Sequence, residues 1–264
     1  MDRSQLARLA PVLAGCRGEW LEDAELSLFP HAPDAAGLSL FLEDPRAHSE
    51  LLGRLERGQE LAENDRRTRR RFPVVPLQWV KLSYVGGELT GLSQYFNLHP
   101  VHDYPIASVR VFVRQFGGSG ADRLEGLLGP SMALPGASWG LALKYPSQEA
   151  PTPRVYGRLA RGALPAVLCG LESEGWLSAG LASEYLAACD PIKAGDHVYL
   201  SVDPGVTDGV SVDLEDVLLV DAPLDAAQLP ASVPLEAAAR YLKCRIPGTS
   251  RVPQWTVYLP LQPP

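Results

Sequence analysis

The sequence predicts an α+β fold, a ten-stranded antiparallel β-barrel with helices on its outer, solvent-facing side. Two observations favour this fold: five segments have the pattern of a β-hairpin, and stretches of helical character separate them. Strands that follow one another through tight turns are antiparallel, and closing amphipathic antiparallel strands into a barrel hides their edges. We therefore expect one domain of repeated hairpin and helix units over residues 1–264.

The clearest hairpin is "LQWVKLSYVGGELTGLSQYFNLHP" at residues 77–100. Two runs rich in Val, Leu, Tyr and Trp flank Gly86 and Gly87, which supply the positive φ angles that a tight turn needs. The other four hairpins are expected at residues 24–44, 137–159, 196–217 and 239–261, with turns around residues 33–37, 146–153, 204–209 and 247–248 respectively.

Helices are expected between the hairpins. Residues 45–65 space their leucines for one apolar helix face, residues 161–175 and 178–190 have the character of a short helical pair, and residues 224–242 that of another pair interrupted by prolines. Residues 104–129 fit a helix or a strand by periodicity, and the order of the other units favours a helix.

Charge and composition exclude several classes of function. The net charge of -7 argues against a nucleic-acid binder, which needs a basic face. The arginine-rich run at 66–71 is interpreted as a solvated helix end or loop, and His99 and His102, separated by Pro100, as loop residues and not a metal pair. The N-terminal segment has neither the pattern of a secretion signal nor that of a membrane span, so we expect a cytoplasmic monomer.

The cysteines support the same compartment. They are far apart and show no Cys-x-x-Cys spacing, which favours buried free thiols over a zinc or redox site. The four are Cys16, Cys169, Cys189 and Cys244.

Alternation along the expected strands decides which side chains face the inside of the barrel. Val80 and Leu82 suit the face under the helices, which leaves Lys81 facing inward. The inward set is Trp79, Lys81, Ser83, Ser93, Tyr95, Asn97, Lys144, Arg154, Tyr156, Arg158, Tyr199, Ser201, Asp203, Lys243, Arg245, Thr256 and Tyr258. A barrel of roughly eight strands has an interior that side chains just fill, and a ten-stranded barrel is wider. We therefore expect a lumen that holds a ligand.

Several cations with phenol hydroxyls inside a partly dry cavity are typical of a site for a multiply charged anion, because unpaired buried cations are costly. Arg and Lys grip phosphate oxygens, and Tyr adds a neutral donor and a π face. The π faces can also stabilise a carbocation. This chemistry suits the ionisation of an allylic diphosphate.

The order of five hairpins with outer helices, and strand pieces such as "WVKLSYVGG", "LALKYP", "RVYGRL" and "YLKCRIPG", resemble the αββα-barrel aromatic prenyltransferases, also called ABBA or PT-barrel enzymes. The resemblance spans about residues 22–262. It implies transfer of a prenyl group from an allylic diphosphate to an aromatic acceptor, a small phenol or indole or a peptide side chain. The resemblance implies that no cofactor is required, and it does not decide whether the reaction depends on Mg²⁺. The Asp-Asp-x-x-Asp element of the helical prenyl synthases is not visible in the sequence.

The resemblance also implies roles for individual residues. The diphosphate ligands would be Lys81, Lys144, Arg154, Tyr156, Lys243, Arg245 and Tyr258. Tyr95 and Tyr199 would shield the carbocation, Glu25 would engage the acceptor, and Trp79 would contact the acceptor, although Trp79 suits the core equally. The basic-x-Tyr element of the family is present as "RVY" at 154–156, whereas "SQY" at 93–95 and "TVY" at 256–258 lack its cation.

Two other functions remain open from the sequence. One is a barrel that binds an anionic lipid or cofactor without turning it over. The other is an acyl-thioester enzyme, which would need Asp203 or His197 as an acid or base. The residues do not identify the acceptor, the prenyl chain length or the position of prenylation.

Overall fold

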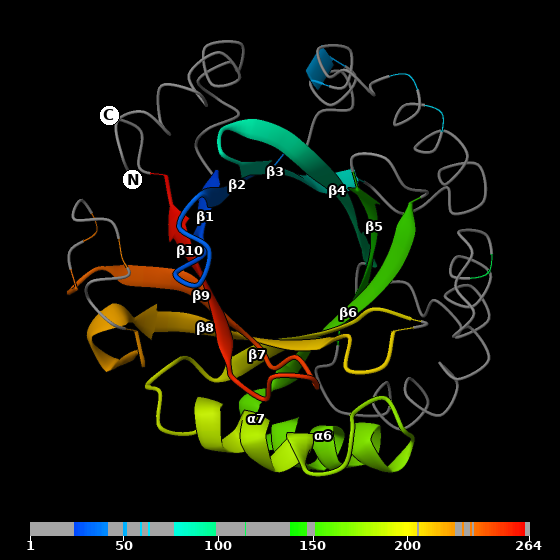
Figure 1. The fold of residues 1–264 in the computed structure, drawn as a ribbon, viewed down its shortest axis with the longest axis vertical. Coiled ribbons are helices and arrows are strands. Elements are labelled where there is room, and N and C mark those ends of the chain that lie inside the picture. The colour runs from blue at the N-terminus through cyan, green and yellow to red at the C-terminus, as the bar shows by residue number, and fades with distance from the viewer. Residues whose placement is uncertain are drawn as a thin grey trace.

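Ten antiparallel strands close into a barrel (Figure 1). The computed structural model describes residues 24–41, 77–98, 138–146, 151–204, 206–224 and 235–261, with single positions at 50, 51, 59, 63, 114, 229 and 233. The strands are β1 (Glu25–Leu28), β2 (Ala35–Phe41), β3 (Leu77–Val85), β4 (Glu88–Leu98), β5 (Ser138–Pro146), β6 (Thr152–Ala160), β7 (His197–Val202), β8 (Val210–Leu218), β9 (Ala238–Arg245) and β10 (Gln254–Pro260). Each pairs with its sequence neighbours, and β1 closes the ring by pairing with β10. The predicted barrel is confirmed, while one domain over residues 1–264 stays a prediction.

The strand ends that each hairpin joins all lie at one end of the barrel, which we call the hairpin end. The β3–β4 turn is the predicted two-residue loop, since Val85 pairs with Glu88 and Gly86 and Gly87 have φ angles of 58° and 88°.

The first turn was predicted too late in the chain. It ends at Asp34, and Gly37 lies inside β2, where it pairs with Ser27 and Ser83. A Cβ atom at Gly37 would lie 2.8 Å from Cε of Lys81. This glycine therefore marks a close approach inside the barrel and not a turn.

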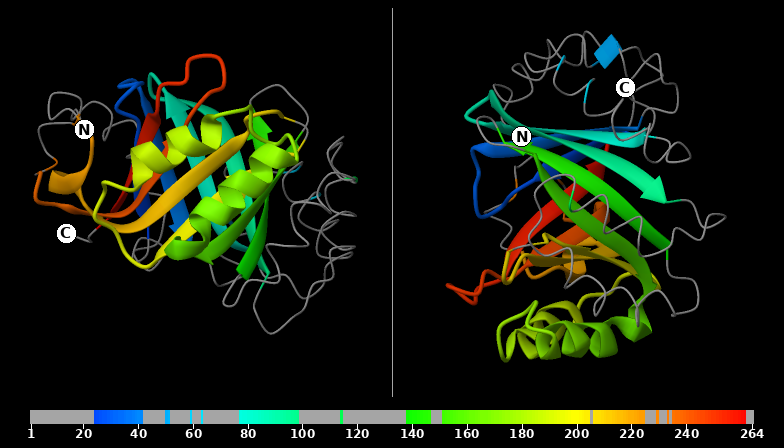
Figure 2. Two further views of the ribbon diagram at one scale, coloured as in Figure 1. Left: turned by 90° about the horizontal axis from the view of Figure 1, so that it is seen from below. Right: turned by 90° about the vertical axis from the view of Figure 1, so that its right-hand side faces the viewer.

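Two helices cover part of the outer face. They are α6 (Leu164–Ser173) and α7 (Leu181–Cys189), and they lie side by side outside the barrel below β7 in Figure 1 (also Figure 2). Their apolar faces pack on outward residues of the barrel, where Val198, Leu200 and Leu242 are fully or almost fully buried. Tyr185 of α7 fixes the helix, because its hydroxyl donates to the Val210 carbonyl at 2.7 Å and accepts from the Ile246 amide at 2.9 Å.

The helices expected at 161–175 and 178–190 are thus confirmed. The prediction of helix over 224–242 is wrong for its last residues, which belong to β9. A 3₁₀ turn covers Leu219–Asp221, Leu235 and Glu236 lie in a turn, and β9 starts at Ala238. The alanine-rich run favours a helix locally, yet pairing with β8 and β10 overrides that preference.

Other expectations fall mainly outside the described residues. At 45–65 the four described positions are helical, and at 104–129 the single one, Arg114, is helical. Cys16, His99, His102 and the run 66–71 are not described. Cys189 and Cys244 are buried free thiols as expected, whereas Cys169 is free but exposed. Within the described residues, no helix is long and apolar enough to cross a membrane.

Candidate active site

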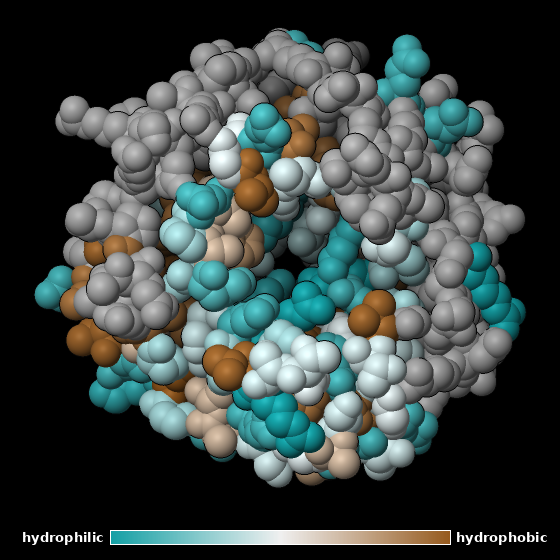
Figure 3. Space-filling view, viewed as in Figure 1, coloured by the Kyte–Doolittle hydropathy of each residue, from teal (hydrophilic) through white to brown (hydrophobic). Residues whose placement is uncertain are grey.

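The barrel is hollow, and Figure 3 shows hydrophilic side chains around the opening at its centre. The hollow has two adjoining chambers with lining residues in common. The cation chamber lies toward the hairpin end, encloses about 1010 Å³ including solvent at its mouth, and is lined by Phe29, His31, Lys81, Ser83, Gly91, Leu92, Ser93, Tyr95, Lys144, Tyr145, Arg154, Ser211, Lys243, Arg245, Gln254, Thr256 and Tyr258. The aromatic chamber lies toward the other end, encloses about 770 Å³ counted in the same way, and is lined by Glu25, Ser39, Trp79, Tyr95, Arg154, Tyr156, Tyr199, Ser201, Asp213, Tyr241, Lys243 and Tyr258.

The two chambers share a wall. Tyr95, Arg154, Lys243 and Tyr258 line both of them. The two chambers therefore adjoin, and they present different side chains, cations in one and aromatic rings in the other.

All eleven predicted site residues line one or both chambers. Their inward orientation agrees with strand alternation, because Val80 and Leu82, on either side of Lys81, are completely buried in the outer core. Arg245 is the most peripheral, since it is exposed at the mouth of the cation chamber.

Lys81 is, together with Arg154, one of the two most deeply buried cations that line the chambers. Its Nζ donates a hydrogen bond to the Tyr258 hydroxyl at 3.0 Å and lies 5.4 Å from the centre of the Phe29 ring. No described carboxylate lies within ion-pair distance of it. Burial lowers the pKa of Lys81 well below its usual range, and the charge of Lys243 acts in the same direction. A dianionic ligand would supply the counter-charge that this side chain lacks.

Arg154 and Lys144 share one carboxylate, that of Asp203. Arg154 donates to it from Nε at 2.5 Å and from Nη2 at 2.7 Å, and Lys144 donates from Nζ at 2.8 Å. Burial acts to raise the pKa of Asp203, but the charges and hydrogen bonds of Arg154 and Lys144 outweigh it and hold that pKa well below its usual range. Asp203 is therefore ionised at neutral pH.

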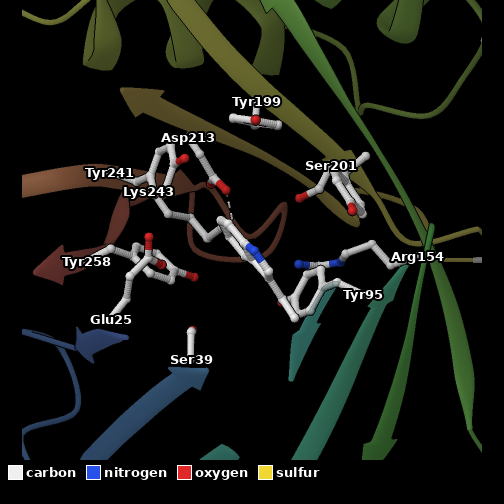
Figure 4. A pocket seen from close by; sticks show the side chains of 12 residues that line it. Glu25, Ser39, Tyr95, Arg154, Tyr199, Ser201, Asp213, Tyr241, Lys243 and Tyr258 are labelled. Carbon is white, nitrogen blue, oxygen red and sulfur yellow. Dashed lines mark ion pairs between the residues drawn. The ribbon is translucent and has the colours of Figure 1, made fainter. Parts of the chain in front are cut away.

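Lys243 stands between the two chambers. Its Nζ lies 3.2 Å from Oδ2 of Asp213, the ion pair drawn in Figure 4, and 5.5 Å from the centre of the Tyr258 ring. Asp213 and Lys243 are direct neighbours across β8 and β9.

Six aromatic side chains form a continuous belt around the lumen. Neighbouring ring centres are 5.7 to 6.4 Å apart, mostly edge to face, a geometry that aromatic pairs prefer. We call this set the aromatic belt, and its members in order are Trp79, Tyr95, Tyr156, Tyr199, Tyr241 and Tyr258. Burial raises the pKa of all five tyrosines above the ordinary value, so they are neutral phenols at physiological pH. The belt thus presents π faces without an anionic nucleophile.

Two further ion pairs lie on strands that contribute to the aromatic chamber. Glu25 is 2% exposed and accepts a hydrogen bond from Arg240 at 3.1 Å, and Glu215 accepts two from Arg158 at 2.8 and 3.0 Å. Burial raises the pKa of Glu25, and Arg240 opposes that shift.

In the lining of the aromatic chamber, sequence reasoning missed Tyr241, Asp213 and Ser39. Tyr241 is two residues before Lys243 and shares its face, so alternation alone could have found it. It lies where the helix expected at 224–242 and the hairpin expected at 239–261 overlap, and it was not assigned to the inward face. Asp213 alternates with the apolar Val212 and Leu214 in the same way.

A metal cluster is not apparent at the site. The described residues contain no group of three or more His, Cys, Asp or Glu side chains placed to hold a metal ion. Positive charge in the cation chamber comes from its basic side chains.

Comparisons with known proteins agree with the architecture. No family model matches the sequence, and no curated protein matches it by sequence. Solved structures do match. The apo form of prenyltransferase PriB is 18% identical with a TM-score of 0.62, over 98% of this chain and 91% of that one. A 6-dimethylallyl tryptophan synthase is 14% identical with a TM-score of 0.67, over 97% and 94%.

A third structure is 6-dimethylallyltryptophan synthase from Micromonospora olivasterospora in complex with DMASPP and Trp. It is 17% identical with a TM-score of 0.63, over 97% of this chain and 95% of that one. By its fold, this chain is a PT barrel. The cation chamber and the aromatic belt are therefore features of the lumen of a PT barrel.

Proposed function

We propose that the protein is an aromatic prenyltransferase, which moves a prenyl group from an allylic diphosphate to an aromatic acceptor. One observation carries the proposal: a chamber lined by cations and a chamber lined by aromatic rings meet inside one closed barrel and share four residues. The PT-barrel fold and the ligands named for one structural neighbour, DMASPP and Trp, support it.

The diphosphate would bind in the cation chamber. Lys81, Lys144, Arg154, Lys243 and Arg245 supply positive charge, and the Tyr258 hydroxyl supplies a neutral donor. Tyr156 lines the aromatic chamber and would contribute its ring there. When the bond between C1 and oxygen breaks, its electron pair stays on the diphosphate, and the cations and the Tyr258 hydroxyl stabilise the charge that develops there. Because the basic side chains already supply positive charge, we expect turnover to survive chelation by EDTA. Activity lost with EDTA and restored by Mg²⁺ would show that a metal ion takes part.

The prenyl cation would lie inside the aromatic belt. The rings of Tyr95 and Tyr199 stabilise it by cation-π attraction and keep water away from C1. An aromatic carbon of the acceptor then attacks C1, and the proton on that carbon is lost as aromaticity returns.

The acceptor would lie against Trp79, with Glu25 accepting a hydrogen bond from its N–H or O–H group. An indole or phenol fits this description because it combines a flat ring with one polar donor. The acceptor can be free or part of a peptide. We further propose that the protein is a monomer in the cytoplasm.

The test is direct. The protein is incubated with dimethylallyl or geranyl diphosphate and a panel of phenols, indoles and Tyr- or Trp-containing peptides, and products are detected by mass as the addition of one prenyl group. Formation of neither an adduct nor the prenyl alcohol would contradict the proposal.

The alternatives make different predictions. A barrel that only binds an anionic lipid or cofactor would retain its ligand without turnover in this assay. An acyl-thioester enzyme is disfavoured, because Asp203 is held as the counter-ion of Arg154 and Lys144 and His197 lines neither chamber.

A further inference from the structure

Asp203 lies behind the cation chamber. It directly follows β7, its side chain is 15% exposed, and it is in contact with Arg154 and Lys144. Those two cations line the chamber, but Asp203 lines neither chamber. The carboxylate therefore acts on the chamber through its two partners and not by touching a ligand there.

The contact with Arg154 fixes one edge of the guanidinium. Asp203 takes Nε and Nη2 in a two-point contact, which holds the plane of the group. Nη1 is then the group directed to a ligand, and Figure 4 shows the Arg154 side chain extending into the lumen.

The contact with Lys144 acts on charge. The pKa of Lys144 is lowered to about 7, because burial and the neighbouring Arg154 charge outweigh the charge and the hydrogen bond of Asp203, which raise it. The other titratable or charged side chains around the chamber are His31, Lys81, Tyr95, Tyr145, Lys243, Arg245 and Tyr258. Among the described residues, Asp203 is the carboxylate that forms an ion pair with Lys144 and favours its charged form.

We propose that Asp203 is a positioning residue of the diphosphate site, which favours the protonated form of Lys144 and holds the Arg154 guanidinium in the orientation that receives the anion. The inference rests on the proposed function, because it takes the cation chamber as the diphosphate site. The alternative hypothesis is that Asp203, as a carboxylate near an anion site, only repels the anion.

The two views predict opposite results for Asp203→Asn. If Asp203 positions the cations, the variant binds the anion more weakly, and the loss of affinity with rising pH begins at lower pH. If Asp203 only repels or competes with the anion, the variant binds more tightly and its pH dependence does not move.

The experiment is calorimetric titration of the full chain with inorganic pyrophosphate from about pH 6 to about pH 9. We expect wild-type affinity to fall above about pH 7 as Lys144 loses its proton. In Asp203→Asn we expect affinity at about pH 7.5 to be lower by about tenfold or more, with the fall moved by about one pH unit to the acid side. Ionisation of pyrophosphate is common to all variants and cancels in the comparison.

Two variants serve as references. Asp203→Glu keeps the charge, so it should retain the wild-type pH dependence. Asp221→Asn removes the same charge outside the lumen, where Asp221 lies 3.4 Å from the exposed Lys193, and should bind pyrophosphate as the wild type does.

Lys144→Met provides a check that does not require Asp203→Asn to fold. The part of the pH dependence assigned to Lys144 must be absent in this variant, and its persistence would overturn the proposal. Unchanged or tighter binding by a folded Asp203→Asn variant would also overturn it. Failure of the wild type to bind pyrophosphate would instead remove the proposed diphosphate site, and with it the proposed function.

Discussion

The ammonium of Lys81 donates a hydrogen bond to the Tyr258 hydroxyl at 3.0 Å and lies 4.4 Å from the centre of the same ring. Tyr258 therefore contacts a deeply buried cation of one chamber and, through its neighbour Tyr241, belongs to the aromatic belt of the other. If the bond between C1 and oxygen of a prenyl diphosphate breaks beside Tyr258, the anion is left beside Lys81 and the carbocation beside the rings of the aromatic belt.

We expect the buried ammonium of Lys81 to lower the free energy of unfolding and to strengthen binding of the diphosphate. Lys81→Met keeps the length of the side chain and removes a buried charge, so we expect the free energy of unfolding to stay equal or rise by about 1 to 3 kcal/mol. Pyrophosphate binding should weaken by about tenfold or more. Thermal unfolding and calorimetry measure the two effects, with Lys193→Met on the outer surface as the control. A large loss of stability with unchanged binding would assign Lys81 to the core.

Tyr156 should act through its ring. It lies 5.8 Å from Tyr95 and 6.4 Å from Tyr199 in the aromatic belt. Tyr156→Phe keeps the π face, so we expect prenyl transfer within a few-fold of wild type, whereas Tyr156→Leu removes it and should raise the proportion of prenyl alcohol formed by attack of water on C1. The ratio of alcohol to adduct, measured by mass, decides. An equal ratio in both variants would show that the ring does not protect the carbocation.

The inward face of each strand could be predicted because alternation depends only on neighbouring residues. Val80 and Leu82 are fully buried, so the position of Lys81 between them allows one orientation in a paired strand. The same reasoning placed Arg154 and Tyr156 in the lumen. Closure of the barrel followed from the number of hairpins.

The partners of the cations could not be predicted in the same way. Asp213 lies opposite Lys243 because β8 and β9 pair in one register, but a long connection joins these strands and no tight turn fixes that register. The link between Asp203 and Lys144 also depends on the curvature of three strands. Such contacts arise from tertiary structure, which a single sequence read by pattern does not specify.

We expect protonation of Glu25 to cause a fall of kcat/KM for the acceptor at low pH, which is the acidic limb of the pH profile. Burial raises its pKa from the ordinary value, so the carboxylate becomes protonated as pH falls through a value above 4.5. If the ionised form accepts the hydrogen bond of the acceptor, kcat/KM for the acceptor falls in that window. Glu25→Gln should lower this quantity at neutral pH by about 10-fold to 100-fold and abolish the limb, with pyrophosphate binding unchanged. A limb that survives in Glu25→Gln would assign it to another group.

Gly140 should be required for the position of Tyr156. The two residues are paired across β5 and β6, and a Cβ atom at Gly140 would overlap the Tyr156 ring. We expect Gly140→Ala to destabilise the protein by about 1 to 3 kcal/mol and to displace the ring from the aromatic belt, which raises the proportion of prenyl alcohol. Thermal unfolding and product ratios are the measurements.

Gly162→Ala is the matched control, because a Cβ atom there meets nothing within 4 Å, and its stability should change by less than about 0.5 kcal/mol. In a Tyr156→Leu background, which replaces the rigid ring by a smaller side chain, Gly140→Ala should cost less than it does alone, because the overlap is removed. Additive costs in the two backgrounds would show that the methyl group clashes with something other than Tyr156.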